Sequence, residues 1–160
     1  MSATQTHEHW FVTADSRRAI LFRGSKDEHN RLRLAEDRSV LNVHENDHEH
    51  QRPSALGRVA SSGAAPSFAS FGHSEEECRR RFARDVCAWL RKAHEQLQFP
   101  TVTVFAPPEF IGHLRTELNG LSSKVELRRA ELTKLPKGEL ATHPAILEEV
   151  QRQEARRCRR

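Results

Sequence analysis

Three acidic side chains follow apolar runs of the sequence, and carboxylates gathered at the end of a sheet can hold a divalent cation. Asp15 follows the run Trp10–Ala14, and Glu109 follows the run Thr101–Ala106. Glu131 follows the stretch Val125–Ala130, in which apolar and charged residues are mixed. If the first two runs are parallel neighbouring strands, the three carboxylates fall near one edge of the sheet, where oxygen ligands suit Mg²⁺. The pattern therefore allows a metal-dependent hydrolase.

Each of these carboxylates also has a structural explanation. Aspartate is a common turn residue because its side chain accepts hydrogen bonds from nearby backbone N–H groups, which suits Asp15. Glu109 would lie in the first turn of a helix, where the helix dipole favours an acidic side chain. We therefore expect structural roles for these residues in preference to catalytic ones, and we predict no catalytic residue and no cofactor.

Arginines are the second candidate set, because the guanidinium fork matches phosphate and carboxylate groups. Arg58 lies in a polar, glycine-containing stretch and could instead pin that stretch to an internal carboxylate. The sequence leaves both roles open. The full set of candidate binding residues is Asp15, Arg17, Arg18, Arg58, Glu109, Arg115 and Glu131.

Histidines form a third set, at positions two residues apart that project the same way in an extended segment and could chelate a transition metal. They are His44, His48 and His50, with Asp47 beside them. No compact three-ligand spacing is present, so we predict a solvated polar loop in preference to a metal site. Walker, Gly-x-Gly-x-x-Gly and Gly-x-Ser-x-Gly motifs are absent from the sequence.

The stretch Thr101–Arg115 must position several of these residues, and it predicts a buried strand that runs directly into a helix. Its first part is β-branched and aromatic, which favours a strand. Pro107 cannot continue a central strand, whereas Pro108 suits the first turn of a helix. Open α/β sheets place ligands at such junctions. The two prolines, however, remove backbone N–H groups that a phosphate-binding loop would offer.

The remaining apolar runs predict a mixed sheet. Trp10–Asp15 and Ala19–Arg23 flank a polar turn and indicate a β-hairpin. Residues 32–43 are compatible with a third strand or a second hairpin, and Val125–Ala130 with a last strand. Because strands and helices alternate only in the second half, we predict an α/β fold with an antiparallel edge hairpin and a parallel centre.

The middle of the chain predicts a mobile insertion followed by a long helix. Residues 44–73 are first polar and then rich in serine, alanine and glycine, without the apolar density that would offset the entropy of ordering. Ser74 with Glu77 matches a capping box and predicts a helix over Glu75–Gln98. Its apolar stripe, which includes Phe82 and Trp89, is predicted to pack on the sheet.

Length and charge predict a single domain over residues 1–150 and a basic tail over residues 151–160. The tail holds five arginines and one glutamate, and the formal net charge is +4, so the preceding residues balance to zero. We expect a frayed chain end there, able to contact RNA phosphates. The tail arginines are Arg152, Arg156, Arg157, Arg159 and Arg160.

The three cysteines predict a reduced, cytoplasmic protein. Cys78, Cys87 and Cys158 are odd in number and far apart, which does not suit a disulfide framework. The amino terminus lacks the pattern of a signal peptide, and no apolar run approaches about 18 residues, so no membrane insertion is expected.

Several blocks of the sequence together resemble the bacterial family described as "protein required for attachment to host cells". The blocks are Trp10–Phe22, Gly57-Arg58, Phe82–Val86, Val104–Arg115 and Glu131–Leu135. The segment Ala-Pro-Pro-x-Phe-x-Gly-x-Leu-Arg is the most specific of them. The resemblance implies a three-layer α/β domain, similar to the central domain of archaeal and eukaryotic release factors and to ribonuclease-H-like folds.

The release-factor likeness does not extend to peptidyl-tRNA hydrolysis, because that reaction uses a Gly-Gly-Gln loop and this chain has no Gly-Gly pair. Family members usually carry aspartate where this chain has Glu131. Our leading hypothesis is a non-enzymatic cytoplasmic binding protein that contacts RNA or a ribosomal particle. The alternatives are a divalent-metal-dependent nuclease or hydrolase, and an indirect adaptor in cell-surface attachment with a protein partner.

Overall fold

The computed structural model contains one five-stranded sheet and, in the part of the chain that it describes, four helices. The described residues are 7–44, 68–118, 120, 121 and 124–159. The strands are β1 (His9–Ala14), β2 (Arg18–Lys26), β3 (Leu32–Leu41), β4 (Val102–Ala106) and β5 (Val125–Arg129). The helices are α1 (Phe68–Leu97), α2 (Pro108–Glu117), α3 (Lys137–Thr142) and α4 (Pro144–Arg157).

The sheet is mixed, as the sequence predicts. Its strand order is β3-β2-β1-β4-β5. β1 pairs antiparallel with β2 and parallel with β4, while β4 pairs parallel with β5. The hairpin therefore lies on one side of the sheet, and the proline-terminated strand β4 is an interior strand next to β1. Both of these predictions are confirmed.

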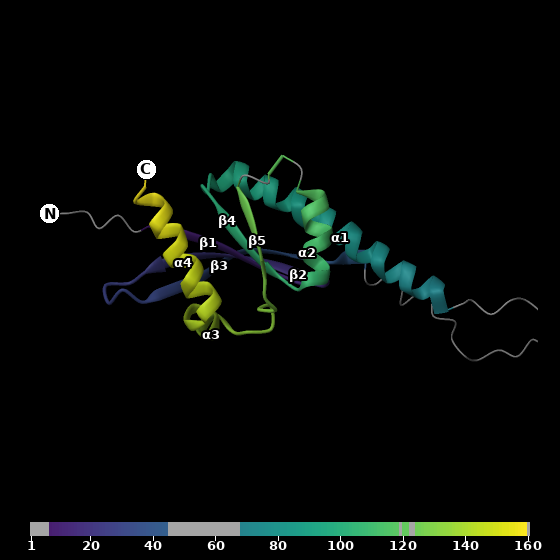
Figure 1. Cartoon of the computed structure of the whole chain (residues 1–160), viewed down its shortest axis with the longest axis horizontal. Helices are drawn as coiled ribbons and strands as arrows, with labels where there is room; N and C mark the ends of the chain where they lie inside the picture. Colours follow the sequence, from purple (N-terminus) through teal and green to yellow (C-terminus); the bar gives the residue numbers. More distant parts are fainter. Residues whose placement is uncertain (1–6, 45–67, 119, 122–123, 160) are drawn as a thin grey trace, which may run out of the picture.

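Helices cover both faces of the sheet, which gives three layers (Figure 1). α1 and α2 pack on one face and α3 and α4 on the other. Successive side chains of β1 point to opposite faces of the sheet. Trp10 and Val12 therefore lie in the core under α1, whereas Phe11 lies in the core under α4. β1 is consequently buried over its whole length.

The third strand is a single continuous edge strand, β3, and residues 32–43 do not form a second hairpin. Opposite Leu21 and Phe22 the register shifts, so that Asp37 is an extra residue of β3. The bulge lies beside two further charged residues, Glu36 and Arg38. A charged, bulged edge resists pairing with another strand.

The prediction for the start of the long helix is wrong. α1 begins at Phe68, so Ser74 and Glu77 lie inside it and do not form a capping box. Residues 68–73, predicted as loop, are helical as well. A single interior glycine, Gly72, costs only about 1 kcal/mol, which a long helix tolerates because its elongation is cooperative. The rest of the predicted insertion, residues 45–67, lies outside the described residues.

Gly24 is required by close packing in β2. A Cβ atom built there would lie 3.1 Å from Leu34 Cδ2 and 3.2 Å from both Leu32 Cδ1 and Phe11 Cε2. We expect Gly24→Ala to lower the free energy of unfolding by about 1–2 kcal/mol, because the three side chains must shift. Urea denaturation measures this, with Gly138→Ala in α3, where the added Cβ meets nothing within 4 Å, as the control. Equal effects of the two substitutions would contradict the packing argument.

Candidate functional site

Asp15 holds the turn between β1 and β2. Its Oδ1 accepts hydrogen bonds from the backbone N–H groups of Arg17 at 2.8 Å and Arg18 at 2.9 Å. Its Oδ2 accepts a hydrogen bond of 2.6 Å from the Thr133 hydroxyl. Both carboxylate oxygens are therefore used within the protein, and the turn role that the sequence favours is confirmed.

The same turn is joined to the segment after β5 by a second bond. Arg18 Nη2 donates to the backbone oxygen of Thr133 at 2.5 Å. This bond and the one from the Thr133 hydroxyl to Asp15 join the same two segments. We call the pair of bonds the Asp15–Thr133 contact. Sequence reasoning missed Thr133, because 118 residues separate it from Asp15 and no local pattern marks it. The contact makes the turn and the segment after β5 one continuous surface.

The three candidate carboxylates share one edge of the sheet but do not gather into a metal site. Asp15, Glu109 and Glu131 all follow the carboxyl ends of the parallel strands β1, β4 and β5. Glu109 and Glu131 are exposed, whereas Asp15 is half-buried. Across residues 7–44, 68–118 and 124–159, with 120 and 121, no group of three histidine, cysteine, aspartate or glutamate side chains could hold a metal ion.

The candidate arginines do not lie at one place in the structure. Arg17 and Arg18 are exposed on the β1–β2 turn. Arg115 is exposed in the last turn of α2, so it lies about 10 Å along the helix axis from Pro108, at 1.5 Å per residue, and away from the edge. Arg58 lies outside the described residues, as do His48 and His50.

Asn42, which follows β3, connects the turn to α1. It is buried, and its Nδ2 donates to the Ser16 backbone oxygen while its backbone N–H donates to the Arg17 oxygen, each at 2.7 Å. Its Oδ1 accepts from the His44 backbone N–H at 3.0 Å. The His44 ring in turn lies 2.8 Å from Asp85 Oδ2 of α1. His44, proposed in the sequence as part of a histidine cluster, thus pairs with a helix carboxylate.

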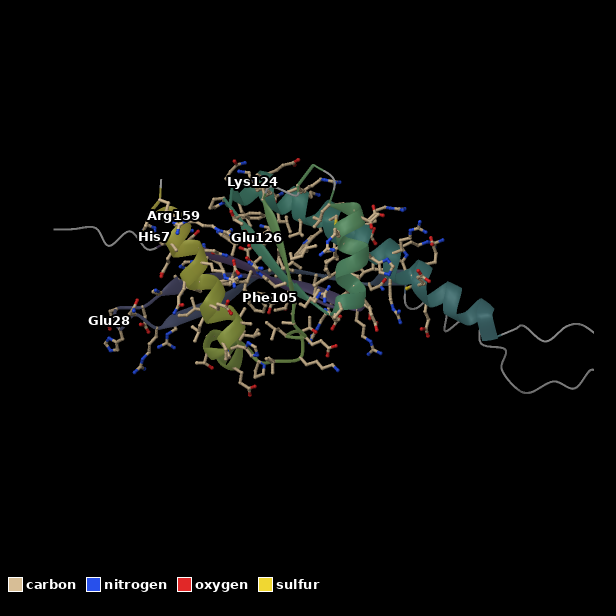
Figure 2. The ribbon with its side chains drawn as sticks, viewed as in Figure 1. His7, Glu28, Phe105, Lys124, Glu126 and Arg159 are labelled. Carbon is tan, nitrogen blue, oxygen red and sulfur yellow. The ribbon has the colours of Figure 1, made fainter. Side chains whose placement is uncertain are left out.

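The basic tail is not a frayed chain end over the residues that the structure describes. Residues 151–157 continue α4, and their arginines contact acceptors of the protein. Arg152 pairs with Glu148 at 2.5 Å, and Arg156 pairs with Glu126 of β5. Figure 2 shows Glu126 in the region of α4 and Arg159 at the carboxyl end of this helix. Arg157 donates to the backbone oxygen of Glu8 at 2.6 Å.

The helix continues because its inner face meets the sheet. Arg156 has an acidic partner distant in sequence, Arg152 has one a helical turn away, and Gln153 in this segment is 6% exposed. The separate tail is therefore a correction for residues 151–157.

The cysteines do not add a reactive group to the edge. Cys78 and Cys87 are buried free thiols of α1, and Cys158 is an exposed free thiol after α4. Burial raises the pKa of Cys87 to about 12, which keeps it protonated and unreactive at neutral pH.

The fold and this edge define a mixed α/β protein whose parallel strands end in a turn held by Asp15 and lined with arginine. Residues 10–143 match the family described as "Protein required for attachment to host cells", and the chain belongs to that family. A comparison with curated proteins finds no match. In the described part of the chain, no helix combines the length and apolar content needed to cross a membrane.

The chain is similar to two solved structures from Aquifex aeolicus. The first is a member of the Ppx/GppA protein family, with 11% identity, a TM-score of 0.39 and coverage of 78% of this chain. The second is a PPX-GPPA enzyme, with 10% identity, a TM-score of 0.38 and coverage of 76%. The chain spans only 35% and 36% of the lengths of these two proteins.

Proposed function

We propose that the chain is a non-enzymatic cytoplasmic binding protein of the host-attachment family that contacts RNA or a ribosomal particle at the carboxyl edge of β1, β4 and β5. One observation carries the proposal. The β1–β2 turn presents Arg17 and Arg18 to solvent on a backbone that Asp15 holds with both carboxylate oxygens. A cationic turn fixed before binding loses little conformational entropy when it meets an anion.

Further basic side chains near the Asp15–Thr133 contact support the proposal that this surface binds RNA. Arg129 at the end of β5 and Lys134 beside Thr133 are exposed. Arginine offers a planar fork to phosphate and lysine a point charge, so such a surface suits a nucleic-acid backbone in a sequence-independent way. The use of both Asp15 oxygens within the protein also favours a binding role over chemistry at a metal bound by this carboxylate.

The arginines of residues 151–157 take a smaller part in this proposal than their number suggests. Arg152 and Arg156 have carboxylate partners, and Arg157 binds a backbone oxygen. An RNA phosphate would have to compete with these acceptors. At the sheet edge Arg129 and Lys134 are exposed, and we assign the main phosphate contacts to that edge.

The test is binding of a fluorescently labelled single-stranded RNA of about 20 nucleotides, measured by anisotropy at several salt concentrations. Each phosphate contact contributes roughly 0.7 to the slope of log affinity against log salt for single strands. We expect the double variant Arg17→Gln/Lys134→Gln to flatten the slope by about 1.4. The control, Arg80→Gln/Lys92→Gln on the outer face of α1, removes the same charge and should leave the slope nearly unchanged.

Failure of the unmodified protein to bind either this RNA or purified ribosomes at low salt would contradict the proposal. Cleavage of the RNA on addition of Mg²⁺, lost in Glu109→Gln/Glu131→Gln, would instead indicate a divalent-metal-dependent nuclease. The family description favours a second proposal, an indirect adaptor in surface attachment. That proposal gains support if the protein neither binds nor cleaves RNA.

A further inference from the structure

A chain of buried polar groups joins α4 to the sheet. His9 of β1, Thr103 of β4, and Glu149 and Gln153 of α4 are each no more than 6% exposed. His9 Nδ1 lies 3.1 Å from Gln153 Oε1. Gln153 Nε2 donates to Thr103 Oγ1 at 3.3 Å, and Thr103 Oγ1 donates to Glu149 Oε1 at 3.0 Å. These four residues are called the polar chain below.

Only one assignment of hydrogen-bond donors and acceptors fits the polar chain. The Glu149 carboxylate accepts from Thr103 and, at its other oxygen, from Arg128 Nε at 3.3 Å. Because the Thr103 proton is used there, its oxygen must accept from the Gln153 amide nitrogen. Gln153 Oε1 then faces His9, so His9 Nδ1 must carry a hydrogen. Neutral His9 consequently has its lone pair at Nε2.

Charges of both signs surround His9 Nε2. This atom lies 3.7 Å from Glu154 Oε1 of α4. The same oxygen is already bound by Lys26 Nζ of β2 at 2.6 Å. Two cations, Lys26 and Arg157, act on the ring, and the one carboxylate nearby is shared with a lysine.

Burial is the largest contribution to the titration of His9. Desolvation lowers the pKa of His9 below its ordinary value of 6.5. The hydrogen bond with Gln153, the next largest contribution, raises it, as does Glu154, whereas Arg157 and Lys26 lower it. The unfolded chain, or a chain with a detached helix end, therefore takes up the proton at a higher pH than the docked state. The stability that neutral His9 contributes is present above about pH 6.5 and is lost as the pH falls toward the lower, docked pKa.

We propose that His9 makes the docking of α4 sensitive to pH, so that acidification releases the C-terminal half of the helix from the sheet. The first half of α4 is held differently, because Ile146 and Val150 lie in the apolar core with Phe105. Beyond Val150 the buried contact with the sheet is Gln153 of the polar chain. Local opening confined to this half breaks the contacts of Gln153 with His9 and Thr103, and the ion pair of Arg156 with Glu126.

The segment at the start of β1 and the last turn of α4 form this device together. Arg157 of α4 donates to the Glu8 backbone oxygen, and the neighbouring His9 contacts Gln153 of the same helix. His9 and the whole of α4 lie outside residues 10–143, which match the family. The pH response is therefore a proposal about the ends of this chain and is independent of RNA binding at the carboxyl edge.

The test is hydrogen–deuterium exchange of the full chain at pH 7.5 and 5.5, expressed as protection factors of residues 151–157 and of β4. We expect the protection of residues 151–157 to fall on acidification while that of β4 is maintained. The pKa of His9 differs between the docked and the detached helix. At a pH below both values, the protection falls about tenfold for each pKa unit of that difference. His9→Gln, whose amide can still donate to Gln153, should abolish the pH response, and His29→Gln, in the exposed β2–β3 turn, should preserve it.

A direct titration keeps the proposal testable if His9→Gln does not fold. NMR of the unmodified protein follows the His9 ring, which should titrate over the same pH range in which residues 151–157 lose protection. Loss of protection in His9→Gln equal to that in the unmodified chain would overturn the proposal. So would a His9 ring that becomes protonated while the protection of residues 151–157 is unchanged.

Discussion

Replacing Phe82 with alanine is expected to lower the free energy of unfolding by about 3–5 kcal/mol, the range for a fully buried aromatic side chain. Phe82 of α1 is 0% exposed, and its ring stacks on Phe110 of α2 with centroids 5.7 Å apart. It lies between the sheet and two helices, so its removal leaves a cavity that several rigid elements would have to collapse to fill. Urea denaturation with two-state analysis measures the loss.

Trp89→Ala is the matched control in the same helix. The sequence places both residues on the same apolar stripe, but in the structure Trp89 is only partly buried at the margin of the core. Its truncation leaves a site that water can enter, so we expect a smaller loss than for Phe82. A loss below about 1 kcal/mol for Phe82→Ala, or a larger loss for Trp89→Ala, would contradict this account of the core.

The sequence predicts the sheet well because its signals are local. β4 is marked by β-branched residues and ended by Pro107, and β1 and β2 are marked by apolar runs on either side of a polar turn. The start of α1 was not predictable in the same way. Ser74 and Glu77 have the spacing of a capping box, but this spacing also occurs inside helices, and only the preceding turns decide which applies.

The candidate site was predicted in part. The sequence allows Asp15 to be either a turn residue or a metal ligand, and its hydrogen-bond partners in the structure decide for the turn. Thr133 is 118 residues away, and the His9–Gln153 pair is separated by 144 residues. Contacts across such distances depend on how whole elements pack, which residue spacing does not report. The distribution of charge along the chain does not report such contacts either, since Arg156 meets Glu126 from 30 residues away.

Ending the chain at Val150 is expected to lower the free energy of unfolding by about 2–4 kcal/mol. The truncation removes Gln153 from the polar chain and Glu154 from Lys26, and each lost hydrogen bond or partly buried ion pair costs about 1 kcal/mol or more. For a domain of this size, the melting temperature should fall by roughly 4–16 °C. A segment that only carried positive charge would leave the melting temperature unchanged.

The control must remove charge from the same segment without removing its packing. Arg152→Gln/Arg159→Gln in the full chain changes two exposed side chains and keeps Gln153 in place. Surface changes of this kind fall within about 0.5 kcal/mol, so differential scanning calorimetry should find the melting temperature within a few degrees of the original. A truncated chain as stable as the full one would show that the residues of α4 up to Val150 are enough to dock the helix. Gln153 would then have no part in holding the helix, and the pH response proposed for His9 would fall with it.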